Sequence, residues 1–301
     1  MEQNGRSFSC RLMSQHWVHS VIDSAARGDE RPTVAALRLL LHENDGDVDD
    51  ALDAALRSAG EAGAARLTKM ATLLADARRD ATALRAVAAA GPGLARADQG
   101  LVEVRSWAAA FDQAARISHT AASALYSLGD SERLAAATRE VCAYLDARSF
   151  ITETTRVIDV GAGGGRILEA IAPWIAYGVG IDISAEMLAS ARPHDNVAYL
   201  QTDGCNLRAF KDNSFDLAIA VESFPYLVAS GLDDIHIAEA ARVLSPGGAL
   251  VIMNYSYRGD RNEDRMSFVA ACAVHELTPT ILGEQPFELW DGTVFAARRL
   301  Q

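Results

Sequence analysis

A glycine-rich stretch between residues 157 and 166 is the first feature of this chain with chemical meaning. It reads V-I-D-V-G-A-G-G-G-R, a short apolar run followed by Gly161, Gly163 and Gly165 at alternate positions. An amphipathic segment over residues 167–175 follows directly. Glycine at a strand-to-helix turn permits positive φ and lets a ligand approach the backbone, and the first N–H groups of the helix point toward that ligand. The stretch therefore predicts the binding site of a nucleotide-type cofactor.

Three acidic residues stand at the ends of predicted strands. Asp159 lies two residues before Gly161, while Asp182 and Asp203 follow the next two apolar runs. In an open α/β sheet, ligands bind beyond the carboxyl ends of the strands. Asp182 lies about 20 residues past the first glycine, where an acidic side chain can bind both ribose hydroxyls. We therefore expect the three carboxylates to surround one cofactor.

The residue after the glycines argues against a dinucleotide. The fingerprint G-x-G-x-x-G needs its third glycine at position 166, where this chain has Arg166. The carboxylate of Asp159, beside the turn, suits an ammonium group better than a pyrophosphate. A nicotinamide cofactor remains an alternative, because Asp182 would suit NAD equally well.

The elements that must position these residues change character near residue 150. The first part shows only helical periodicity, and its clearest helix carries an apolar stripe from Leu67 to Ala88. Such a stripe packs inside a bundle or against a second subunit, and the pattern leaves both open. The acidic run at 43–50 lacks the spacing of an EF-hand, which favours a solvated loop. The predicted helices cover residues 32–42, 49–58, 66–90, 101–128 and 131–148.

The second part alternates β-rich runs with amphipathic ones, which predicts βαβ units and a parallel sheet. The dipeptide Asp291-Gly292 separates the last two β-rich runs, so the sheet should end in an antiparallel hairpin. A break is expected at 245–248, S-P-G-G. The predicted strands are 157–160, 178–181, 197–201, 217–221, 249–254, 277–289 and 293–299. The predicted helices are 167–175, 185–192, 233–244 and 263–276.

The composition excludes several classes of protein. The 301-residue chain has a net charge of −12 and no basic stripe, which argues against a nucleic-acid partner. Its four cysteines are far apart, a spacing that indicates neither a metal site nor a disulfide framework. The amino terminus lacks the apolar core of a signal peptide, and no apolar run reaches membrane-spanning length. We therefore expect a soluble, cytoplasmic protein that has no membrane partner.

Four segments resemble class I S-adenosylmethionine (SAM)-dependent methyltransferases: D-V-G-A-G-G-G-R, G-I-D-I-S, T-D-G and F-D-L-A-I-A-V-E-S. The expected terminal hairpin is also similar to that family. The resemblance covers residues 156–301 and implies SAM as the cofactor. It implies a Rossmann-like α/β domain over 101–301, with a seven-stranded, mostly parallel sheet and helices over 101–148 that cover the cofactor. Residues 1–100 would form an all-helical domain that caps the site or mediates a homodimer.

The family pattern, carried over residue by residue, implies roles at the cofactor site. Gly161, Gly163 and Gly165 would lie under the methionyl part of SAM. Asp159 would lie beside its amino group, and Asp182 would hold the ribose.

The same resemblance implies residues for the adenine. Asp203, with the backbone of Gly204 and Cys205, would recognise its polar edge, and Ile183 and Met187 would flank the ring.

The resemblance also implies that Glu222, just past the fourth strand, lines the junction between cofactor and substrate. No catalytic residue is assigned, because methyl transfer from a sulfonium needs a base only when the nucleophile must lose a proton. His119, Glu222 and Tyr255 are candidates for that base. Further residues from loops at the same edge and from the preceding helices are candidates for the substrate wall: Tyr126, Phe224, Tyr226, Asn254, Tyr255 and Tyr257.

The chain departs from two branches of the family. The loop after the fifth strand, N-Y-S-Y-R-G-D, lacks the histidine of plant-type O-methyltransferases. The D/N-P-P-Y/F signature of nucleic-acid amino-group methyltransferases is also absent. We therefore expect methylation of an oxygen or nitrogen atom of a small molecule, in secondary metabolism. A nicotinamide-dependent oxidoreductase and a non-catalytic SAM-binding protein are the alternatives.

Overall fold

The computed structural model describes residues 16–42, 47–90 and 102–300. Its seven strands form one sheet in the order β3-β2-β1-β4-β5-β7-β6. Strands β1 to β5 pair in parallel, and β7 runs antiparallel between β5 and β6. This confirms the predicted Rossmann-like sheet with its antiparallel hairpin. The strands are β1 Arg156–Val160, β2 Tyr177–Asp182, β3 Val197–Gln201, β4 Phe215–Val221, β5 Leu244–Met253, β6 Leu277–Glu284 and β7 Val294–Arg299.

Helices cover both faces of the sheet because successive strand residues point to opposite sides. Val157 packs with helices α8 and α9 on one face, and Ile158 packs with α12 and α13 on the other. Both faces are apolar, as a buried parallel sheet requires. The helices of this part are α8 Ser131–Ala147, α9 Arg166–Ile171, η3 Ala172–Trp174, α10 Ala185–Leu188, α11 Phe224–Ala229, α12 Asp233–Val243 and α13 Arg261–Val274.

Several local predictions for this part are wrong. Helix α10 ends at Leu188 and not at residue 192, and strand β6 ends at Glu284 and not at residue 289. The break expected at 245–248 does not exist, because β5 continues through these residues and absorbs them as an irregularity in its pairing with β4. Gly247 takes a positive φ of 79° there. The structure also has a short helix that was not predicted, α11, which has a proline in its first turn.

The amino-terminal part is helical, as predicted, but its long helix is divided. A 3-10 turn at Arg78–Asp80 separates α4 from α5. The residues of the expected apolar stripe are buried inside the chain on both sides of this turn, for example Leu67 in α4 and Leu84 in α5. Residues 43–46 of the acidic run lie outside the described residues, and its last residues begin α3. Residues 16–27 are helical. The other helices are α2 Pro32–His42, α3 Asp47–Ser58, α4 Glu61–Ala77, η1 Arg78–Asp80 and α5 Ala81–Ala90.

The helix expected over 101–128 is three shorter ones: α6 Val104–Ile117, α7 His119–Ser123 and η2 Leu125–Ser127. Ser118 interrupts them, because its backbone is extended and its side chain accepts a hydrogen bond from the N–H of Ala121. The helical core of the amino-terminal part continues into these helices through Ala114, Ala121 and Leu128. The division of the chain at residue 100 stays a prediction, and that boundary lies outside the described residues.

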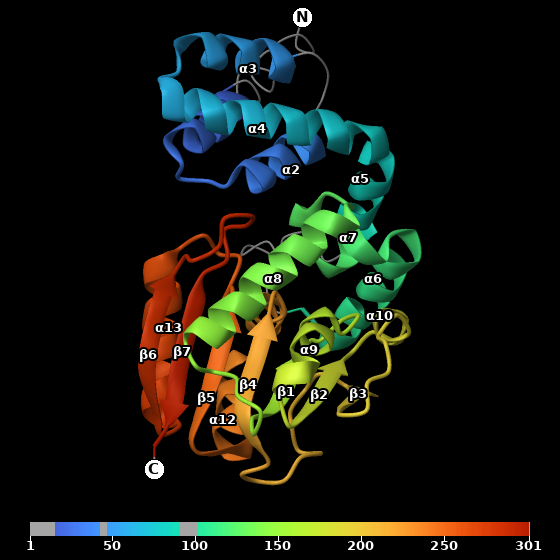
Figure 1. The fold of residues 1–301 in the computed structure, drawn as a ribbon, viewed down its shortest axis with the longest axis vertical. Coiled ribbons are helices and arrows are strands. Elements are labelled where there is room, and N and C mark those ends of the chain that lie inside the picture. Colours follow the sequence, from blue (N-terminus) through green and yellow to red (C-terminus); the bar gives the residue numbers. More distant parts are fainter. Residues whose placement is uncertain (1–15, 43–46, 91–101, 301) are drawn as a thin grey trace, which may run out of the picture.

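The helical part lies beyond the end of the sheet toward which β4 points, so that it stands over the carboxyl ends of the strands (Figure 1). Helix α2 is fastened there, because the N–H of Arg31 donates to Asp291 (3.0 Å) and the hydroxyl of Thr33 donates to the carbonyl oxygen of Leu289. Across the described ranges, no helix is long and apolar enough to cross a membrane.

Candidate functional site

The glycine turn between β1 and α9 is built so that side chains would not fit. Gly161, Gly163 and Gly165 have φ values of 77°, 55° and 78°, which favour glycine. A Cβ on Gly161 would overlap Ser223, and one on Gly165 would overlap the ring of Tyr199. The predicted turn is therefore present, and its backbone is open on the side where a ligand can approach.

Asp182, at the end of β2, organises the second wall of the turn. Its carboxylate accepts the N–H of Gly163 (2.7 Å) and the N–H of Ser184 (2.8 Å). Ser184 in turn donates its hydroxyl to Asp112 of α6 (2.5 Å). Burial raises the pKa of Asp182, and the two backbone hydrogen bonds oppose that rise. Because a carboxylate has about four acceptor positions, Asp182 keeps capacity for a ligand hydroxyl.

Asp159 carries a buried oxygen without a partner. Its side chain is 1% exposed, and its Oδ2 atom makes no hydrogen bond. Burial raises the pKa of this carboxyl to about 7, against the lowering effect of Arg166. A buried unpaired carboxylate oxygen is costly, and a cationic ligand group would remove that cost.

Arg166, the residue that replaces the third glycine of a dinucleotide site, begins α9. Its guanidinium donates to the hydroxyl groups of Thr138 (3.0 Å) and Tyr126 (3.5 Å). Tyr126 stacks on Trp290, with ring centroids 5.1 Å apart. The arginine side chain therefore joins the turn to α8, η2 and the loop before β7.

Glu222 and Asn254 follow β4 and β5, and both take left-handed backbone conformations, with φ values of 64° and 68°. The side-chain amide of Asn254 donates to Glu222, and the hydroxyl of Tyr257 donates to its other oxygen at 3.3 Å. Burial raises the pKa of Glu222 to about 7, while these hydrogen bonds and Arg166 lower it. Strained backbone at two adjacent strand ends that hold one carboxyl group is typical of a functional site.

One cavity of about 580 Å³ joins these features, a volume within the ~300–1,000 Å³ of small-molecule sites. It runs from the glycine turn to the amino-terminal helices α2 and α5. Most of the predicted site residues line it: Asp159, Gly161, Gly163, Asp182, Ile183, Met187, Gly204, Glu222, Tyr126, Tyr226, Asn254 and Tyr257.

Other predicted residues lie elsewhere. Asp203 and Cys205 are exposed and do not line the cavity, and the carboxylate of Asp203 accepts the N–H of Cys205 (3.0 Å). Phe224 and Tyr255 are buried together in the core on the α12–α13 face of the sheet, with ring centroids 5.1 Å apart. The hydroxyl of Tyr255 donates there to Asp233 (3.2 Å).

Gly165 and His119 are also absent from the cavity wall. The carbonyl oxygen of Gly165 accepts a hydrogen bond from the hydroxyl of Tyr199 (3.2 Å). The Nδ1 atom of His119 is buried and has no hydrogen-bond partner.

Sequence reasoning missed several wall residues. Trp107 and Phe111 of α6 contact Tyr226, with ring centroids 5.4 and 5.1 Å away. Trp107 also donates to Ser230 at 2.9 Å, which fixes α6 over the site. His236 of α12 lines the cavity, and burial lowers the pKa of its imidazole. Their spacing carries no motif, because they reach the site only through packing.

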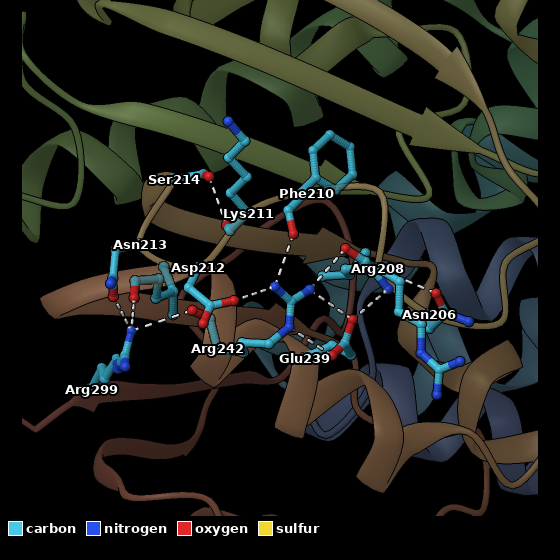
Figure 2. Close-up of polar contacts among 12 residues, drawn as sticks. Asn206, Arg208, Phe210, Lys211, Asp212, Asn213, Ser214, Glu239, Arg242 and Arg299 are labelled. Carbon is cyan, nitrogen blue, oxygen red and sulfur yellow. Dashed lines mark hydrogen bonds and ion pairs between the residues drawn. The ribbon is translucent and has the colours of Figure 1, made fainter.

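The loop between β3 and β4 is anchored from outside the cavity (Figure 2). Arg242 of α12 donates to the carbonyl oxygens of Leu207 (3.0 Å) and Phe210 (2.8 Å) and pairs with Glu239 (2.8 Å). Glu239 also accepts the N–H of Leu207 (3.1 Å). These contacts hold the loop that carries Gly204 into the cavity wall.

Among the residues that the structure describes, no cluster of His, Cys, Asp or Glu could hold a metal ion. The described cysteines Cys142, Cys205 and Cys272 are free thiols. Cys10 lies outside the described residues.

Comparison with known proteins shows to which protein family the segment with these features is similar. Residues 158–252 match the methyltransferase domain family. This segment contains the glycine turn and the carboxyl groups of Asp159, Asp182 and Glu222. The chain carries a class I SAM-dependent methyltransferase domain. The expected family and its cofactor, SAM, are confirmed.

Two relatives each match about a third of this chain. The demethylmenaquinone methyltransferase of Tropheryma whipplei is 37% identical over 111 residues, which cover 36% of this chain and 44% of that protein. The ubiquinone biosynthesis O-methyltransferase of Saccharophagus degradans is 31% identical over 110 residues, which cover 35% of this chain and 45% of that protein. This chain therefore spans less than half the length of these curated relatives.

A solved SAM-dependent methyltransferase from Mesorhizobium loti is 18% identical, with a TM-score of 0.41, and the match covers 54% of this chain and all of that one, 100%.

Proposed function

We propose that this chain transfers a methyl group from SAM to an oxygen or nitrogen atom of a small molecule. The observation that carries the proposal is one cavity whose wall includes both Asp159, with its unpaired carboxylate oxygen, and Glu222. The first suits the ammonium group of SAM, and the second suits the proton of an acceptor.

The residues of the turn would hold the cofactor. Gly161 and Gly163 leave room for the methionyl part, while Asp159 receives its ammonium group and Asp182 its ribose hydroxyls. Ile183, Met187 and Gly204 line the remaining wall and would enclose the adenine. The adenine role expected for the side chain of Asp203 and for Cys205 stays a prediction, since neither lines the cavity.

When bound, SAM supplies an activated methyl group on a sulfonium. The protein's own residues would orient the acceptor and remove its proton. Glu222 is the base in this proposal, because it lines the cavity and its pKa of about 7 lets it accept a proton near neutral pH. Asn254 and Tyr257 hold the carboxyl group in place, and Tyr226 lies beside it. His119 and Tyr255 have no part in this proposal, because neither lines the cavity.

The helices before β1 would enclose the reaction. Asp112 of α6 accepts a hydrogen bond from Ser184 beside the proposed cofactor site, and Trp107 of the same helix lines the cavity and donates to Ser230. Residues of α2 and α5 complete the wall. We therefore propose that the helical part caps the cavity. A homodimer, a cytoplasmic location and a role in secondary metabolism stay predictions.

Binding and turnover test the proposal on the full chain. Calorimetry with SAM, S-adenosylhomocysteine and NADH should give micromolar binding of the first two and none of the third. Incubation with methyl-labelled SAM and a panel of phenols and amines should then label at least one acceptor. NADH binding without SAM binding would favour the oxidoreductase, and SAM binding without labelling of any acceptor would favour a non-catalytic SAM-binding protein.

A further inference from the structure

We propose that the part of the cavity enclosed by the amino-terminal helices binds the apolar body of the methyl acceptor, so that the acceptor is an uncharged hydrophobic molecule whose phenolic hydroxyl lies at Glu222. The inference rests on the proposed function and gives the acceptor of that reaction a chemical class.

Helix α2 has two apolar faces, and only one of them is fully buried. Ala35, Ala36, Leu39 and Leu40 are fully buried in that core. The other face carries apolar residues at helical spacing that are only partly buried and that line the cavity: Val34, Leu37 and Leu41. Val34 and Leu37 also pack at the edges of the sheet core and the helical core, and Leu41 belongs to neither. This second face is continuous with the cofactor site, so its occupant is a ligand of that site.

The remaining walls of this part are mainly apolar, and Asp291, which accepts the N–H of Arg31, is a polar exception. Val87 and Ala88 of α5 lie in the same lining, and Trp107 and Phe111 come from α6. A wall of aromatic and aliphatic side chains binds most favourably a ligand with a large apolar surface, because that surface is then removed from water.

The one cation on the second face of α2 is compensated. The guanidinium of Arg38 donates to both carboxylate oxygens of Glu30, at 2.8 and 2.9 Å, and lies over the ring of Trp17 at 5.4 Å. Glu30 is only 6% exposed, so the pair holds its geometry. Arg38 therefore offers no uncompensated charge to an anionic acceptor. Arg166 also lines the cavity, but its charge is shared with the carboxylates of Asp159 and Glu222, whose pKa values it lowers.

The polar end of the cavity selects the reacting group. Glu222 has one oxygen bonded to Asn254 and the other at 3.3 Å from the hydroxyl of Tyr257. A free phenol has a pKa of about 10, so a carboxylate with a raised pKa that is held beside it can share and then accept its proton. The apolar face would then hold the substituent of the ring.

The experiment measures the binding of 4-alkylphenols, from 4-methylphenol to 4-octylphenol, by calorimetry with and without S-adenosylhomocysteine. The dissociation constant should fall about fourfold for each added methylene until the apolar space is filled. A 4-hydroxyphenylalkanoate of equal length should bind at least tenfold more weakly, because it carries an anion into the apolar part.

Two variants test the location. Leu37→Trp should weaken 4-octylphenol at least tenfold and leave 4-methylphenol and S-adenosylhomocysteine within twofold, and Leu41→Phe should do the same to a smaller degree. Val274→Trp, on the exposed surface of α13, is the matched control and should change nothing.

Equal affinity along the series, tighter binding of the anion, or an unchanged series in both variants would each overturn the inference. If S-adenosylhomocysteine binds and the series is flat, the proposed function stands and only the acceptor class is wrong. If the series depends on chain length but S-adenosylhomocysteine does not bind, the apolar site stands and the proposed function is refuted.

Discussion

The two ends of the cavity are built by different means. The cofactor end comes from one continuous stretch, residues 157–204, and consists of backbone turns, strand ends and carboxylates. The end that we propose for the acceptor comes from α2, α5, α6 and the loop before β7, which are far apart in the chain, and it consists mainly of apolar side chains. If the proposed roles are right, cofactor binding depends on backbone geometry and charge, whereas the choice of acceptor depends on side-chain volume.

The largest expected effect lies where the two ends meet. Glu222→Gln keeps the shape of the side chain but cannot accept a proton, so methyl transfer should fall by about 10²–10⁴-fold. SAM affinity should change by less than threefold. In the parent protein the rate should fall as the pH drops below about 7, because protonation of Glu222 removes the base, and in the variant it should be flat there. Rates with labelled SAM between pH 5 and 9 measure this.

Glu153→Gln, on an exposed linker residue, is the control for that substitution. An unaltered rate and pH profile in Glu222→Gln would mean that the acceptor loses its proton elsewhere.

Steric closure of the turn should have the next largest effect. Gly161→Ala and Gly247→Ala both place an alanine at a φ near 78°, at 77° and 79°. Only the first meets a neighbour, the Cβ of Ser223, whereas Gly247 has nothing within 4 Å. The second variant should therefore lose about 1–2 kcal/mol of unfolding free energy from backbone strain alone. The first should lose about 1–3 kcal/mol more and at least tenfold in SAM affinity.

Urea unfolding and calorimetry on the two variants give that comparison directly. Equal losses would mean that the turn moves away from Ser223 without disturbing the site.

The strand-end acids should differ from each other. Asp182 lines the cavity and holds the turn, so Asp182→Ala should weaken SAM binding by about 1–3 kcal/mol. Asp203 is exposed outside the cavity, so Asp203→Ala should have a clearly smaller effect. Calorimetry on both variants checks this order, and a larger loss at Asp203 would place the adenine against that loop.

Replacement of Asp159 is expected to raise the free energy of unfolding and to lower the affinity for SAM. Its pKa rises from the ordinary value of 3.8 to about 7 on folding, so the folded state binds the proton more tightly. Its contribution to stability is present below pH 4 and is lost as the pH rises through 7. Asp159→Asn should therefore match the parent at pH 4 and be more stable at pH 8, by on the order of 4 kcal/mol. It should bind SAM more weakly at both pH values.

Urea unfolding at the two pH values, with calorimetry at pH 8, measures both effects. Greater stability at pH 8 together with undiminished SAM affinity would show that Asp159 does not bind the ammonium group.

Local signals explain why so much of the cofactor end could be predicted. Gly161 and Gly163 mark a turn that needs positive φ, and Asp182 follows its strand directly, so each position depends on a few neighbouring residues. Tyr255 shows the limit of this reasoning. It follows Asn254, whose left-handed backbone redirects the chain, and its ring turns into the core rather than toward the cavity.

The sequence alone determined the α/β sheet, its terminal hairpin, the glycine turn and the family, because these follow from periodicity and from residues close together in the chain. The position of the proposed acceptor end could be seen only in the tertiary structure. Whether α2 presents Leu37 to a cavity depends on its fastening to Asp291, more than 250 residues away. Such a contact cannot be recognised from a local sequence pattern, because it depends on how whole helices and loops pack together and not on the conformational preference of any single segment.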